Sequence, residues 1–203
     1  SRYIQLIADL VEGKKVLDTG MTQEIDRCRA ALEEAAAGEN VVVISSGDAG
    51  IYGMAGLVLE LLMKMDEDQR PEFGGVIPGV SAMSAAAGLL GAPIMHDFAV
   101  ISLSDLLTPW ELIQERAELA AKGDFVTVLY NPRSHKRVGQ IQAVQEIFLR
   151  ERAPETPVGI VTSASREGEN VVISTLGAFT KEDINMFSIV IIGNSKTKQN
   201  GQW

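Results

Sequence analysis

The residues best suited to bind a ligand lie in a glycine-rich turn at residues 46–53, SGDAGIYG, which follows the β-branched run 41–44. Its glycines let the backbone approach a ligand closely, and Asp48 can accept a hydrogen bond from a hydroxyl or an amine. The same pattern fits an ordinary tight turn in which Asp48 caps a helix. Spacing alone leaves both interpretations open.

A second turn, PGVSA at residues 78–82, leads from a short apolar run into an alanine-rich stretch. Free N–H groups at the start of a helix there can hold an anion, and an ordinary Ser81 cap is the alternative. Another turn further along the chain, ASREGE at residues 164–169, is typical of a hairpin loop. These turns indicate a small-molecule ligand and leave its chemistry open.

A third turn, LYNPRS at residues 129–134, opens a cluster of basic residues. Cations at the start of a helix oppose its dipole, so their presence suggests an anionic ligand such as a carboxylate. A solvated charge cluster is the alternative interpretation. The cluster consists of Arg133, His135, Lys136 and Arg137.

Hydrolytic and metal chemistry find no support in the sequence. The two histidines, His96 and His135, have no serine or aspartate at triad spacing, and no Cys/His cluster suits zinc. The single cysteine, Cys28, lies in a helical pattern, where it is expected to be packed rather than nucleophilic.

Alternating strand and helix patterns position these turns. We expect helices at 24–37, ended by Gly38, and at 52–65, 81–90, 109–122 (capped by Thr108) and 134–152. We expect strands at 41–47, 76–78, 97–103, 125–130, 158–163, 170–176 and 187–192. The pattern predicts two α/β lobes, residues 1–105 and 106–203, with a ligand cleft between them. The first sheet is expected to be mainly parallel and the second mixed, because its last three strands are closely spaced.

The chain has 203 residues, of which 46% are hydrophobic, and a net charge of −9. That charge argues against general binding to nucleic acid, whose phosphates attract basic surfaces. The run from Ile51 to Met65 is too short and too charged to span a bilayer, and the first residues lack a secretory cleavage site. A cytoplasmic location follows as the default.

The turns 46–53 and 78–82, in this order and spacing, resemble those of the tetrapyrrole methylase superfamily. Four further segments resemble its precorrin-3B C-17-methyltransferases: ISLSDLLTPW (101–110), LYNPRS (129–134), TPVGIV (156–161) and IGNS (192–195). Ala49 stands where the superfamily usually has proline. Members of the family begin with a further strand and a Gly-Pro-Gly loop, so we expect this chain to lack the first βα unit and to stop short of the usual end.

The resemblance implies an S-adenosylmethionine-dependent C-methyltransferase of cobalamin biosynthesis, which methylates carbon 17 of precorrin-3B or its cobalt form with ring contraction. It also implies a homodimer. Another tetrapyrrole methylase and a non-catalytic tetrapyrrole-binding protein of the same fold remain alternatives. The implied cofactor-binding residues are Gly47, Asp48, Ile51, Tyr52, Ser81, Ala82, Tyr130, Asn131 and Ala164.

Ring contraction displaces a carbon from the macrocycle and needs proton transfer, for which we consider Asp105, Ser104, His96 and His135. A tetrapyrrole carries several carboxylates, and arginine and lysine bind carboxylates with charge-assisted hydrogen bonds. The expected substrate-binding residues are Arg133, Lys136, Arg137 and Arg166.

Overall fold

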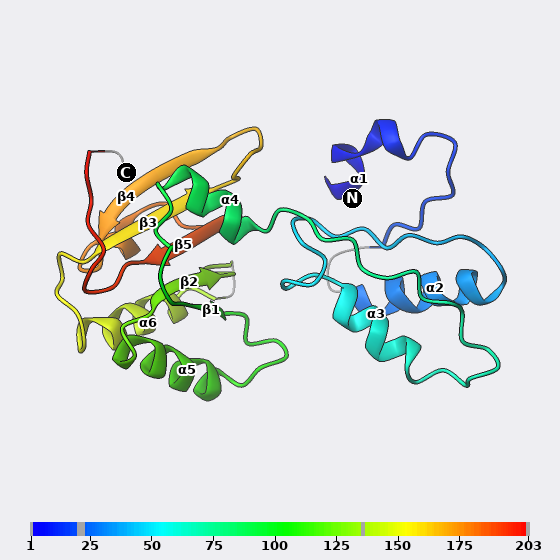
Figure 1. Ribbon diagram of the computed structural model, residues 1–203, viewed down its shortest axis with the longest axis horizontal. Helices are drawn as coiled ribbons and strands as arrows, with labels where there is room; N and C mark the ends of the chain where they lie inside the picture. Colours follow the sequence, from blue (N-terminus) through cyan, green and yellow to red (C-terminus); the bar gives the residue numbers. More distant parts are fainter. Residues whose placement is uncertain (1, 20–22, 135–136, 202–203) are drawn as a thin grey trace. The chain divides into compact units, whose positions relative to one another are not determined.

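The computed structural model describes residues 2–19, 23–134 and 137–201 and is drawn as a ribbon in Figure 1. The chain divides into two compact units, residues 1–81 and 82–203. This division falls ahead of the expected lobe boundary at 105 and 106, because residues 82–105 supply a helix and a strand to the second unit. Among the helices of the described ranges, none combines the length and apolar character needed to cross a membrane.

The first unit contains α1 (Arg2–Leu6), η1 (Ala8–Leu10), α2 (Glu24–Ala36) and α3 (Ala55–Leu62). Helices α2 and α3 pack together through a small apolar cluster made of Cys28, Leu32, Val58 and Leu62. Cys28 is fully buried in it, which confirms its expected role as a packed helix residue. Gly38, at φ +97°, ends α2 as predicted, since its N–H and that of Glu39 donate back to the carbonyls of Ala35 and Glu34.

The prediction of a mainly parallel sheet in the first lobe is wrong for the described residues. Residues 41–45 and 76–78 belong to no strand, helix or turn, and residues 46 and 47 form a bend. Val42 is 80% exposed and Ile77 is 86% exposed, so neither run is buried as a sheet interior would be. A β-branched run favours a strand only where a neighbouring strand pairs with its backbone, and the run alone does not supply that partner.

The second unit holds one mixed five-stranded sheet, in the order β1-β2-β5-β3-β4. Strands β1 and β2 pair in parallel, whereas β2–β5, β5–β3 and β3–β4 are antiparallel, which confirms the predicted mixed sheet. The strands are β1 (Phe98–Ser102), β2 (Val126–Tyr130), β3 (Pro157–Thr162), β4 (Asn170–Thr175) and β5 (Ser188–Ile192).

Helices cover both faces of this sheet (Figure 1). Strand alternation sends Leu129 and Val190 into the core shared with α5 (Trp110–Lys122) and α6 (Gln140–Leu149). The intervening residues Val128 and Ile191 face the opposite core, which includes α4 (Ala82–Leu89). The short η2 (Phe179–Lys181) precedes β5, with Phe179 fully buried. The apolar pattern of each strand therefore gives three layers.

Three helix starts differ from their predictions, each for a local reason. Helix α5 has Pro109 at its N-cap with no side-chain hydrogen bond, so Thr108 is not the cap. Helix α3 starts at Ala55 because Tyr52, at φ +52°, cannot continue a right-handed helix. Helix α6 starts at Gln140, and before it the N–H of Ser134 donates to the carbonyl of Arg137 and the N–H of Arg137 donates to the hydroxyl of Ser134, a pairing that an α-helix does not contain.

Candidate active site

In the first unit, the turn at 46–53 is closed by hydrogen bonds from the backbone N–H groups that follow it. Gly47 has φ +73°, a conformation that favours glycine. The N–H of Met54 donates to the hydroxyl of Ser45 at 3.0 Å, and the N–H of Ala55 donates to the carbonyl of Ala49 at 3.0 Å. The turn therefore holds a fixed shape directly before α3.

Asp48 joins this turn to the second one. Its Oδ1 accepts from the N–H of Gly50 at 2.8 Å, and its Oδ2 accepts from the N–H of Gly79 at 3.0 Å. The hydrogen bonds from Gly79 and Gly50 hold the pKa of Asp48 below its usual value. A Cβ on Gly79 would lie 2.2 Å from the carbonyl oxygen of Gly47, so only glycine permits this approach. The structure thus brings together the turns at Gly47 and Gly79.

Around these turns the other residues expected to bind the cofactor differ in exposure. Ile51 is partly exposed and Tyr52 is more so, while Ser81 is buried. The open side of the turn therefore presents apolar side chains beside backbone polar groups.

In the second unit, the expected residues gather at one edge of the sheet. Strands β1, β2 and β3 run in the same direction, because β5 is antiparallel to both β2 and β3. Their carboxyl ends therefore share an edge. The residues that follow them there are Ser104 and Asp105 after β1, Tyr130 and Asn131 at the end of β2, and Ala164 after β3.

Three expected cofactor-binding residues of this unit pack against the same apolar cluster. Ala82, Tyr130 and Ala164 all contact the core on the α4 side of the sheet. The hydroxyl of Tyr130 accepts from the N–H of Met83 at 3.0 Å, which satisfies one of the open donors at the start of α4. That donor, which we considered for an anion, is therefore already paired.

Ser102 links the carboxyl ends of β1 and β2. The sequence analysis did not identify it as a candidate site residue. Its Oγ accepts from Asn131 Nδ2 at 3.0 Å and from the N–H of Ser104 at 3.3 Å. Asn131 itself has φ +50°, a left-handed conformation in which asparagine is tolerated. The available signal was the alternation of two serines in ISLSD, directly after an apolar strand.

The arginines expected to bind substrate fall in different surroundings. Arg133 lines a hollow of about 410 Å³ together with Val138, Met186 and Phe187, and Arg166 is exposed in the turn after β3. Arg137 is directed inward: its Nη1 donates to two backbone carbonyls, and its Nε lies 3.8 Å from Oδ1 of Asp105. Lys136 and His135 lie outside the described residues.

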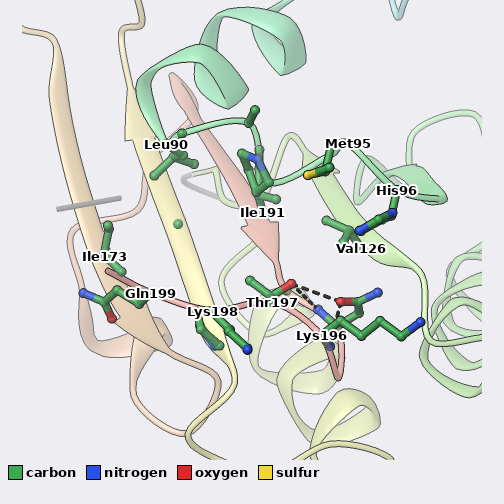
Figure 2. Close-up of a pocket in the computed structure, with 17 residues that line it drawn as sticks. Leu90, Met95, His96, Val126, Ile173, Ile191, Lys196, Thr197, Lys198 and Gln199 are labelled. Carbon is green, nitrogen blue, oxygen red and sulfur yellow. Dashed lines mark hydrogen bonds between the residues drawn. The ribbon is translucent and has the colours of Figure 1, made fainter. Parts of the chain in front are cut away.

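His96 is not brought together with Ser104 and Asp105. It precedes β1, whereas they follow it, so the five-residue strand separates them by about 16 Å. Figure 2 shows His96 at a pocket of about 210 Å³ beside Val126, which begins β2, and Ile191, near the end of β5. That pocket is lined at its rim by Lys196 and Lys198 and lies at the edge opposite Tyr130.

A metal site is not formed by the residues that the structure describes, since they contain no group of three potential Asp, Glu, His or Cys ligands. In the second unit, the candidate residues are two arginine-bearing loops and the hydroxyls of Ser102 and Tyr130; the backbone turns at Gly47 and Gly79 belong to the first unit.

Known proteins resemble this chain over nearly all its length. A family model described as "Tetrapyrrole (Corrin/Porphyrin) Methylases" matches residues 4–180. A "Probable cobalt-factor III C(17)-methyltransferase" of Salmonella typhimurium is 50% identical over 195 residues, which make up 96% of this chain and 80% of that protein. A "Cobalt-factor III methyltransferase" of Priestia megaterium is also 50% identical, over 198 residues, but the chain spans only 36% of its length.

Solved structures agree with these likenesses. A crystal structure of the methyltransferase CobJ has a TM-score of 0.88 and 38% identity, covering 95% of this chain and 80% of that one. A uroporphyrin-III C-methyl transferase from Thermus thermophilus, complexed with S-adenyl homocysteine, has a TM-score of 0.68 and 25% identity, covering 93% and 80%. This chain therefore belongs to the tetrapyrrole (corrin/porphyrin) methylase family, alongside the cobalt-factor III and precorrin-3B C-17-methyltransferases.

Proposed function

We propose that this protein transfers a methyl group from S-adenosylmethionine to carbon 17 of cobalt-factor III or precorrin-3B, with ring contraction, in cobalamin biosynthesis. The observation that carries the proposal is the 50% identity, over 96% of the chain, with the Salmonella relative of that name. The paired turns at Gly47 and Gly79 support it, because they offer a glycine-lined, backbone-rich surface to a small ligand.

The residues of the turns suit such a cofactor. Exposed Ile51 and Tyr52 offer apolar surface to a flat base, and backbone groups of the turn offer partners to its polar atoms. The single cysteine does not compete as a nucleophile: burial raises the pKa of the Cys28 thiol, and the residue lies inside the α2–α3 cluster. S-adenosylmethionine, when bound, supplies an electrophilic methyl group.

The chain's own residues then act mainly by positioning. Asp48 fixes the two turns of the first unit. Tyr130 and Asn131, at the end of β2, are the residues of the second unit expected to bind the cofactor. Holding donor and acceptor in attack geometry is worth roughly 7–11 kcal/mol of barrier, which is why no strong nucleophile is required. Arg133 and Arg166 bind carboxylates of the macrocycle.

Proton transfer during ring contraction is assigned to Ser104. It follows β1 at the carboxyl edge of the sheet, whereas His96 lies at the other edge. Asp105 is engaged by Gln140, whose Nε2 donates to its Oδ2 at 3.1 Å, and by Arg137. We further expect a homodimer in the cytoplasm, and sedimentation would measure the oligomeric state.

Incubation with methyl-labelled cofactor and separate tetrapyrroles tests the proposal. We expect label in cobalt-factor III or precorrin-3B, with the ring-contracted product identified by mass spectrometry and absorption spectra. Label that enters uroporphyrinogen III instead would assign the protein to another branch of the family. Tight cofactor binding without any demethylated product would make it a binding protein.

A further inference from the structure

The guanidinium of Arg137 joins the loops that follow two neighbouring strands. A single nitrogen, Nη1, donates to the carbonyl of Leu103 at 3.0 Å, directly after β1, and to the carbonyl of Asn131 at 2.9 Å, directly after β2. The Arg137 side chain is only 15% exposed. These hydrogen bonds hold the residue after β1 close to the residue after β2.

Asp105 and Gln140 complete this arrangement from two further elements. Asp105 Oδ1 lies 3.8 Å from Arg137 Nε, and its Oδ2 accepts from Gln140 Nε2, in the first turn of α6. Arginine suits this place because its planar fork presents several donors at once, whereas a lysine ammonium is a single point charge. Arg137 and Gln140 therefore hold the start of the loop at 104–109 through Asp105.

Both fastened segments contribute to the proposed site. Asn131 is held in a left-handed conformation at φ +50°, and its side chain also donates to Ser102. Ser104 stands one residue before Asp105 on the other segment. The carbonyl bonds to Arg137 therefore fix the positions of a cofactor-binding residue and of the proton-transfer loop relative to each other.

We propose that Arg137, with Asp105 as its counter-ion, is a positioning residue that sets the geometry of Asn131 and of the loop at 104–109, rather than a ligand of substrate carboxylates. This inference rests on the proposed function. It replaces the sequence-based expectation that Arg137 binds substrate and that Asp105 moves protons.

The test compares Arg137→Met and Arg137→Lys with the unmodified chain. Arg137→Met is expected to weaken S-adenosylhomocysteine binding about 10-fold and to lower kcat about 10- to 100-fold, because small misplacements of reacting groups are costly. The KM for the tetrapyrrole should change less than about 3-fold. Arg137→Lys should stay impaired, since its one nitrogen cannot occupy both the Nη1 position beside the two carbonyls and the Nε position beside Asp105.

A substrate ligand would behave in the opposite way. A raised tetrapyrrole KM with unchanged S-adenosylhomocysteine affinity, partly restored in Arg137→Lys, would overturn the inference. Arg150→Met is the matched control, because the Arg150 side chain is exposed and forms a 3.7 Å surface pair with Glu118. It should leave affinity, kcat and KM unchanged.

Amide hydrogen exchange separates this inference from the proposed function. In ligand-free protein, Arg137→Met should speed exchange at Leu103 and Ser104 about 10-fold, while amides of the β3–β4 pair keep their wild-type rates. Unchanged exchange at Leu103 and Ser104 would refute the positioning role. An unmodified chain that methylates no tetrapyrrole would refute the proposed function alone, and the exchange result would still decide the role of Arg137.

Discussion

Oδ2 of Asp48 accepts a hydrogen bond of 3.0 Å from the N–H of Gly79, a residue 31 positions further along the chain. The other carboxylate oxygen is bonded within its own turn, to Gly50. One side chain therefore sets both the shape of the first turn and its distance from the second.

Asp48→Asn should weaken the link between the two turns. The amide keeps one acceptor oxygen and introduces an NH₂ group that cannot accept from a backbone N–H. We expect S-adenosylhomocysteine affinity to fall about 10-fold, because a hydrogen bond to a carboxylate is stronger than one to a neutral amide. Calorimetric titration measures it, and undiminished affinity would contradict the role given to Asp48.

Gly79→Ala should force the two turns apart. The new methyl group would lie 2.2 Å from the carbonyl oxygen of Gly47, which is backbone and cannot rotate away. Overpacking of this kind costs roughly 1–3 kcal/mol of unfolding free energy, and cofactor binding should be lost with it. Gly74→Ala is the control, since a Cβ there meets nothing within 4 Å. Equal behaviour of the two variants would contradict the close approach.

Arg133→Ala should weaken tetrapyrrole binding and leave S-adenosylhomocysteine binding nearly unchanged. Losing one charge-assisted hydrogen bond to a carboxylate would raise the Kd for the tetrapyrrole about 10-fold. Arg116→Ala, on the exposed side of α5, serves as the matched control. Calorimetry with each ligand measures both affinities, and an equal loss for substrate and cofactor would count against this assignment.

Arg152→Met should destabilise the second unit strongly. The buried guanidinium donates to the carbonyls of Gly193, Ala120 and Phe125, and it stacks 4.7 Å from the centre of the Phe148 ring. Its removal leaves three carbonyls without the donor that the buried guanidinium supplied, and each unsatisfied buried acceptor costs about 1–3 kcal/mol.

Arg150→Met provides the comparison two residues away. Its exposed pair with Glu118 should contribute only about 0–1 kcal/mol. Urea unfolding of both variants measures the difference in free energy. Similar losses in the two variants would show that burial is not what makes Arg152 important.

The ionised carboxylate of Asp124 should make the free energy of unfolding depend on pH. Burial raises the pKa of its carboxyl, but hydrogen bonds from Ser195 and the charge of Arg152 outweigh burial and leave the pKa below its usual value. Because the unfolded state binds the proton more readily, this stabilisation is complete above the ordinary pKa of about 4. It is lost as the pH falls through the lower pKa of the folded state.

Ser195→Ala isolates this contribution, because Asp48 has a pKa shifted in the same direction. The variant should be less stable at pH 7, and its stability should decline less steeply below pH about 4 than that of the unmodified chain. Urea unfolding at a series of pH values gives the slope. A slope equal to that of the unmodified chain would rule out the proposed coupling between Ser195 and Asp124.

Local patterns predicted much of the second unit. The strands starting near Phe98, Val126 and Ser188 lie within two residues of their expected bounds, because each is an apolar run whose alternate side chains enter two different cores. The end of α2 at Gly38 was equally readable, since only a residue tolerant of positive φ fits there.

Features that depend on residues far apart in the sequence could not be predicted from local patterns. The β-branched run at 41–44 favours a strand, but pairing needs a second backbone that the run does not specify. The basic cluster predicted carboxylate ligands for Arg137, yet its carbonyl partners on Leu103 and Asn131 come from other loops. Spacing identified which residues form the turns at Gly47 and Gly79, while their 3.0 Å link through Asp48 required the folded chain.

The two ends of the second unit's sheet carry separate tasks. Arg152 and Asp124 tie the chain together where β2 begins and β5 ends, whereas Tyr130, Asn131 and Ser104 lie where β1 and β2 finish. Substitutions at groups this far apart, with no shared partners, add independently. Under the proposed function, substitutions for a different macrocycle belong at the end of the sheet near Tyr130 and Ser104, and substitutions for stability belong at the end near Arg152.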